Sequence, residues 1–82
     1  EDEELDTPKI GEGSIISPKA EIAKGAKIGK DCTILAHVYV GADVEIDDNT
    51  IIYPNVTIYR DCKIGSNCII HANTTIGSDG LD

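Results

Sequence analysis

The 82-residue sequence contains no Phe, Trp or Met and only three Tyr. Bulky aromatic side chains supply much of the core of a small globular domain, so this chain lacks the usual material for a single round core. Ile and Val instead provide most of an apolar fraction of 40%. An interior built from branched aliphatic side chains suits thin, regular layers better than one compact centre.

Basic residues are also scarce, because seven Lys and Arg stand against fifteen Asp and Glu, for a net charge of −8. Without a basic cluster, the chain is not expected to bind nucleic acid. No apolar run reaches membrane-spanning length, and no signal peptide is visible. Five of the first six residues are acidic, which predicts a solvated tail or cap over residues 1–9 and a folded domain over residues 10–82. The missing initiator Met favours a processed or excised piece.

Cysteine and histidine are limited to Cys32, Cys62, Cys68, His37 and His71. An odd number of cysteines without a Cys-x-x-Cys pair argues against a disulfide framework or a zinc site, and predicts reduced thiols in a cytoplasmic protein. Two histidines are too few for a zinc ion held by three histidines of one subunit. We therefore predict neither a metal ion nor a cofactor.

A strict period of six is the strongest pattern in the chain. From residue 10 onward, every sixth residue is a branched aliphatic: Ile10, Ile16, Ile22, Ile28, Ile34, Val40, Ile46, Ile52, Ile58, Ile64, Ile70 and Ile76. No helix has this period. Two places earlier, from residue 20 onward, every residue is small or β-branched, and all three cysteines fall there. Residues two apart on a strand share a face, so each hexad predicts a short strand with one large and one small residue inward.

The residue three places after each aliphatic predicts a corner. Ten of these twelve residues are Gly, Asn or Asp, and the exceptions are Lys19 and His37. Gly, Asn, Asp and His tolerate the positive φ that tight corners often need. A strand and a corner in every hexad give flat sides, and three sides close a triangle. The twelve hexads therefore predict an all-β fold, a parallel β-helix of about four triangular coils. The spacing leaves its handedness open.

The three predicted sides differ in their outward residues. One side carries Lys9, Lys27, Glu45 and Lys63, and a second carries Glu21, Tyr39, Thr57 and Thr75. Ice binding would need a regular array of threonines along one side, and Glu21 and Tyr39 interrupt the only such column. The third side is apolar, and its candidate interface residues are Ile15, Leu35, Ile51, Tyr53, Ile69 and His71. A large apolar outer face usually marks an interface, so we predict that this side packs in a homotrimer. Cross-strand packing on an exposed sheet is the alternative.

The hexads resemble those of the hexapeptide-repeat transferases. The stretch from Asn49 to Gly80 is most similar to the UDP-3-O-acylglucosamine N-acyltransferases of lipid A biosynthesis, chiefly in Val56-Thr57-Ile58-Tyr59 and Ile76-Gly77-Ser78-Asp79-Gly80. This resemblance implies a left-handed β-helix and a trimer with active sites between subunits. It also implies that a full-length relative transfers a 3-hydroxyacyl group from acyl carrier protein to a UDP-glucosamine derivative, with a histidine as general base.

The resemblance assigns no catalytic residue to this chain. The family's histidine follows an Asp-Gly-Phe-Gly segment, whereas here the segment reads Asp79-Gly80-Leu81-Asp82 and the sequence stops. His71 precedes that segment and is a candidate base only by its residue type. We therefore expect a truncated or engineered solenoid with a structural, trimer-forming role, and acyl carrier protein and a UDP-sugar as partners only of a full-length relative. The alternative is a complete small acyltransferase that acts on an amino sugar.

Overall fold

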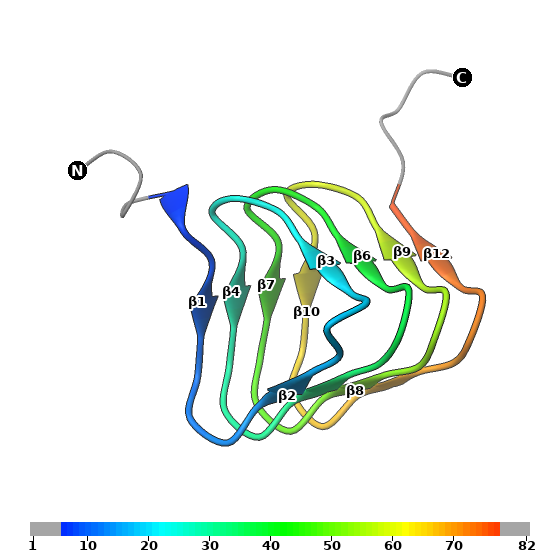
Figure 1. The fold of residues 1–82 in the computed structure, drawn as a ribbon, viewed down its shortest axis with the longest axis horizontal. Coiled ribbons are helices and arrows are strands. Elements are labelled where there is room, and N and C mark those ends of the chain that lie inside the picture. The colour runs from blue at the N-terminus through cyan, green and yellow to red at the C-terminus, as the bar shows by residue number, and fades with distance from the viewer. Residues whose placement is uncertain (1–5, 78–82) are drawn as a thin grey trace.

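The computed structural model describes residues 6–77 as a β-solenoid of four triangular coils (Figure 1). Its strands have two residues each and are β1 (Lys9–Ile10), β2 (Ile15–Ile16), β3 (Glu21–Ile22), β4 (Lys27–Ile28), β5 (Thr33–Ile34), β6 (Tyr39–Val40), β7 (Glu45–Ile46), β8 (Ile51–Ile52), β9 (Thr57–Ile58), β10 (Lys63–Ile64), β11 (Ile69–Ile70) and β12 (Thr75–Ile76). They form three four-stranded sheets: sheet A (β1-β4-β7-β10), sheet B (β2-β5-β8-β11) and sheet C (β3-β6-β9-β12).

Each strand pairs in parallel with the equivalent strand of the next coil. Lys9 lies opposite Lys27, so one coil contains eighteen residues, and the same register continues from β4 to β7. Backbone hydrogen bonds join the coils, as from the Gly11 N–H to the Ile28 carbonyl at 2.8 Å. The predicted parallel β-solenoid is therefore confirmed, and the left-handed sense of its coil stays a prediction from the resemblance.

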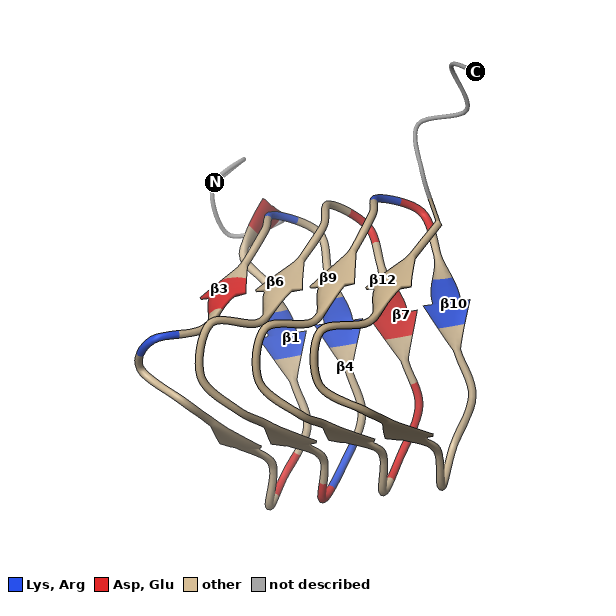
Figure 2. Cartoon of the chain, turned by 90° about the vertical axis from the view of Figure 1, so that its right-hand side faces the viewer, with Lys and Arg blue, Asp and Glu red and all other residues tan. Residues whose placement is uncertain are grey.

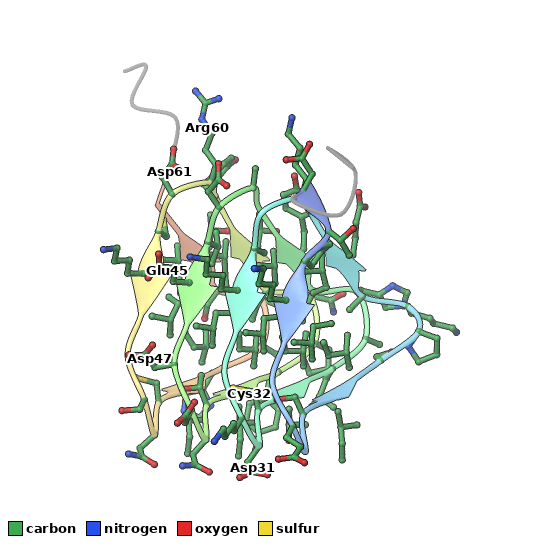
Figure 3. All side chains as sticks on the ribbon, turned by 90° about the vertical axis from the view of Figure 1, so that its left-hand side faces the viewer. Asp31, Cys32, Glu45, Asp47, Arg60 and Asp61 are labelled. Carbon is green, nitrogen blue, oxygen red and sulfur yellow. The ribbon has the colours of Figure 1, made fainter. Side chains whose placement is uncertain are left out.

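The aliphatic residue of each hexad points inward and forms the core. Ile34, Ile52 and Ile58 of the two middle coils have no exposed surface, whereas Ile10 in the first coil is 50% exposed. In Figure 3 the small residue Cys32 points into the interior, while the neighbouring Asp31 lies at a corner and points away. The core therefore lies mainly in the second and third coils, which have a coil on both sides within residues 6–77.

The corners adopt the backbone conformation that their residue types favour. Positive φ occurs at the predicted corner positions Gly13, Gly25, Asp31, His37, Asp43, Asn49, Asn55, Asp61, Asn67 and Asn73. Lys19 differs, because it has no positive φ; the Ser17 carbonyl accepts the Ala20 N–H across its corner at 2.9 Å. The Ser17 hydroxyl oxygen also accepts the Lys19 N–H, at 3.1 Å. The remaining corner position, Asp79, lies outside the described residues.

Replacing Asn55 with Ala should destabilise the solenoid, whereas replacing Lys19 with Ala should not. Both residues occupy the corner between sheets B and C, but only Asn55 has a positive φ, of 64°. An alanine held in the left-handed conformation costs about 1–2 kcal/mol, because its Cβ lies too close to the following carbonyl oxygen. The free energy of unfolding in urea should therefore fall by that amount for Asn55→Ala. Asn55→Gly should restore most of the loss. Equal losses at residues 19 and 55 would contradict this account of the corners.

Residues 1–5 and 78–82 lie outside the described part of the chain. They include most of the acidic tail predicted for residues 1–9 and the end of the domain predicted for residues 10–82, so both boundaries stay predictions. At the first described residue, the Asp6 carbonyl accepts the Gly25 N–H at 2.7 Å and so contacts the corner of the next coil. Within residues 6–77, no helix is long and apolar enough to cross a membrane.

Candidate oligomer interface

The outer face of sheet B carries one outward side chain from each strand. The pairing register places these residues in a ladder: Ile15, Thr33, Ile51 and Ile69. Ile15 is 66% exposed and Ile69 is 56% exposed, while Ile51 is half-buried between its neighbours. The ladder is therefore apolar except at Thr33, and it leaves two isoleucine side chains in water.

A second row of side chains begins one residue beyond the same strands. Leu35 and Tyr53 occupy equivalent positions, since their N–H groups bond to the carbonyls of Ile52 at 3.0 Å and Ile70 at 2.9 Å. The Tyr53 ring stacks on the ring of His71, with centroids 5.8 Å apart and an interplanar angle of 2°. All six residues predicted as an interface therefore lie on or beside sheet B, and we call them the sheet B face.

The other two sides present polar or mixed outer faces. The outward residues of sheet A are, in register, Lys9, Lys27, Glu45 and Lys63. Those of sheet C are Glu21, Tyr39, Thr57 and Thr75. Figure 2 shows the blue and red of charged residues on β1, β4, β7 and β10 and at the corners, whereas the strands of sheet B are tan. Aliphatic outer surface is therefore concentrated on sheet B.

A polar column lies inside the solenoid behind this face, and the spacing of the hexads did not predict it. Ser14, Cys32 and Thr50 each donate a side-chain hydrogen bond to a backbone carbonyl fifteen residues later, at 2.6, 3.1 and 2.7 Å. The hydroxyls also accept from the next coil: the Cys32 N–H bonds to Ser14 at 2.9 Å and the Cys68 N–H bonds to Thr50 at 3.3 Å. The small size of these side chains accounts for their inward position but not for their hydrogen bonds. The signal in the sequence was that every third hexad has Ser, Cys, Thr or Cys at this position, each of which can donate a hydrogen bond.

The cysteines belong to the interior of the solenoid. Cys32 is buried, Cys62 and Cys68 are half-buried in the end coil, and all three are unpaired. Their position as small inward residues is thus as predicted, while the bond from the Cys32 thiol adds a weak polar interaction to its packing.

His71, the candidate general base, lies in the exposed stack with Tyr53 on the last described coil. The part of the chain from residue 6 to residue 77 forms no pocket. Over the same residues there is no group of three His, Cys, Asp or Glu that could hold a metal ion. A general base must lie within hydrogen-bonding reach of a bound substrate. The described residues around His71 thus form no pocket in which a substrate could be enclosed.

The regular coils, the small inward residues and the polar corners define the chain as a hexapeptide-repeat β-solenoid. It belongs to the family described as bacterial transferase hexapeptide (six repeats), which matches residues 7–42 and 43–78. Membership in this family confirms the resemblance of the hexads to those of transferases.

A curated relative extends the comparison to one enzyme. Over 28 residues the chain is 74% identical to UDP-3-O-acylglucosamine N-acyltransferase 1 of Sulfurimonas denitrificans. That match covers 34% of this chain and 9% of the relative, so the chain spans a small part of the relative's length. No solved structure matches the chain.

Proposed function

We propose that this chain is a structural segment of an N-acyltransferase-type β-helix, and that its sheet B face joins three copies into a homotrimer. The observation that carries this proposal is the exposed aliphatic ladder of Ile15, Ile51 and Ile69 on one side only. Single exposed apolar residues are common on proteins, but several of them gathered on one side of a regular sheet are typical of an interface. Burying it among three copies removes this strip from water.

The flat shape of the face supports assembly with parallel axes. Every outward residue of sheet B has an equivalent one coil away, so the side chains form straight rows along the solenoid. The stacked rings of Tyr53 and His71 continue the second row as a flat aromatic surface. Straight rows of this kind can pack along their length against the same rows of another copy.

In this proposal the chain supplies a scaffold and no catalytic group. The relative's name describes N-acylation of a UDP-3-O-acylglucosamine, and acyl carrier protein and a UDP-sugar would be partners of the complete enzyme. The stacking of the His71 ring on Tyr53 within the sheet B face supports a packing role for this histidine. Three unpaired cysteines are in keeping with the reducing cytoplasm that the sequence predicts.

Substituting both Ile51 and Ile69 with Lys should dissociate the trimer, because each copy would bring two charges into a dry interface. Light scattering coupled to size-exclusion chromatography should show three chain masses for the original protein and one for this variant. Thr57→Lys with Thr75→Lys is the matched control, since it adds two lysines at equivalent positions of sheet C in the same two coils. An unchanged mass for the Ile51 and Ile69 variant, or a monomeric original protein, would rule out this interface.

A further inference from the structure

Charged residues are distributed unequally around the second, third and fourth coils. One half of each of these coils contains sheets B and C with the corner between them, and it has no Lys, Arg, Asp or Glu: residues 33–41, 51–59 and 69–77. The strands β6, β9 and β12 are accordingly tan in Figure 2, as are those of sheet B. Within residues 24–77, the Lys, Arg, Asp and Glu side chains therefore all lie on or beside sheet A or at its two corners.

Both histidines of the chain lie in this uncharged half. Histidine is the side chain that ordinarily gains a positive charge between about pH 8 and pH 5. His71 belongs to the sheet B face, where its ring stacks on the Tyr53 ring with an interplanar angle of 2°. His37 lies instead at the corner between sheets B and C, with a φ of 63°. Acid would therefore place charge on a surface that is otherwise neutral, and His71 would bring that charge into the sheet B face.

No counter-charge lies beside His71 among the described residues that surround it. Its neighbour in the same row is Tyr53, and tyrosine ordinarily carries no charge from about pH 5 to pH 8. The corner between sheets B and C has one charged residue, Lys19, which lies in the first coil, whereas His71 lies in the fourth. The carboxylates at the margin of sheet B lie at its opposite corner, in the first three coils: Glu12, Asp31 and Asp48. A protonated His71 therefore has no carboxylate partner within residues 6–77.

We propose that His71 makes the trimer sensitive to pH, so that the copies assemble while its imidazole is neutral and separate when it is protonated. This inference rests on the trimer formed through the sheet B face. Assembly would move the charged ring from water into an apolar contact, which is costly for a charge without a partner. Each neighbouring copy brings the same sheet B face, so it adds no carboxylate to that contact.

The direction of the pH effect follows from where the proton binds more readily. In the free chain His71 is exposed, so water solvates its charge and the ring can still stack on Tyr53 as a cation. In the trimer the same charge loses its water. The free chain therefore binds more protons than the trimer, and falling pH shifts the equilibrium toward the free chain. A threefold assembly contains three copies of His71 in equivalent places, which makes the response steeper.

Sedimentation velocity of the 82-residue chain at about pH 8 and pH 5.5 tests this proposal. The chain concentration for half-maximal assembly should be about 10-fold or more higher at the lower pH. His71→Phe keeps a ring that can stack on Tyr53 but cannot bind a proton, so its assembly should be the same at both pH values. His71→Gln is a second neutral variant. His37→Asn is the matched control, because it removes the other histidine and places at that corner the residue type of Asn55. It should keep the pH response.

Several results would overturn the role of His71. One is a trimer of equal stability at both pH values. Another is dissociation at the lower pH that persists in His71→Phe and His71→Gln or disappears in His37→Asn, because a different group would then be responsible. Circular dichroism at both pH values separates dissociation from unfolding, and unfolding in place of dissociation would also contradict the proposal. A chain that is monomeric at the higher pH would instead contradict the trimer itself, so the two failures are distinguishable.

Discussion

Replacing Ile52 with Ala should lower the free energy of unfolding by about 2–5 kcal/mol, the range for removing a buried aliphatic side chain. Ile52 has no exposed surface and lies in a middle coil, with Ile34 before it and Ile70 after it in its row. Two-residue strands joined by closely stacked corners leave little freedom to close the cavity. Urea unfolding followed by circular dichroism at a fixed chain concentration measures the loss.

Ile10→Ala is the matched control for this substitution. It removes the same atoms from the same hexad position, but Ile10 lies in an end coil and is 50% exposed. Burial stabilises by about 25 cal/mol per Å² of apolar surface removed from water, so a half-exposed side chain contributes less to stability. Its removal also leaves no closed cavity. The loss should therefore be less than half of that for Ile52→Ala. Equal losses would mean that the end coils are covered as well as the middle ones.

Thr50→Val should cost about 1–3 kcal/mol although the two side chains have nearly the same shape. Thr50 is the buried polar residue of the interior, with no exposed surface. Its hydroxyl donates to the Gly65 carbonyl at 2.7 Å and accepts the Cys68 N–H at 3.3 Å. Valine leaves both backbone groups without this partner, inside a solenoid where water cannot easily replace it. The same urea experiment measures the effect.

Thr74→Val provides the control for the lost hydroxyl. Thr74 occupies the same hexad position on the side of sheet C, is half-buried in the end coil, and its side chain does not take part in the polar column. Its replacement should change stability by less than about 0.5 kcal/mol, as for other substitutions that break no interaction. If both valine variants were equally stable, the column of Ser14, Cys32 and Thr50 would have no energetic role.

Most of the fold could be predicted because the residue types within each hexad determine its strand and its corner. An aliphatic such as Ile34 must face inward, a small residue such as Cys32 must share that face, and Asp31 or His37 can adopt the positive φ of a corner. Lys19 shows the limit of this reasoning. Its corner depends on the preceding Ser17, whose hydroxyl and carbonyl close a local turn, and the period alone does not reveal such bonds.

The candidate interface could be predicted as a set of positions but not as a surface. Alternation along each strand identified Ile15, Ile51 and Ile69 as outward residues, and the structure places them in one ladder. The ring stack of Tyr53 on His71 and the different exposure of Ile51 and Ile69 depend on which coils lie above and below. Neighbours across coils are eighteen residues apart, so these contacts exist only once the register between coils is fixed.

The period, the inward residues, the corners and the number of coils could be derived without the structure, because they follow from the local geometry of a strand and a turn. The polar column from Ser14 to Thr50 and the complete burial of the middle coils were visible only in the folded chain. Both depend on contacts between residues about eighteen positions apart, and these contacts exist only when one coil is stacked on the next.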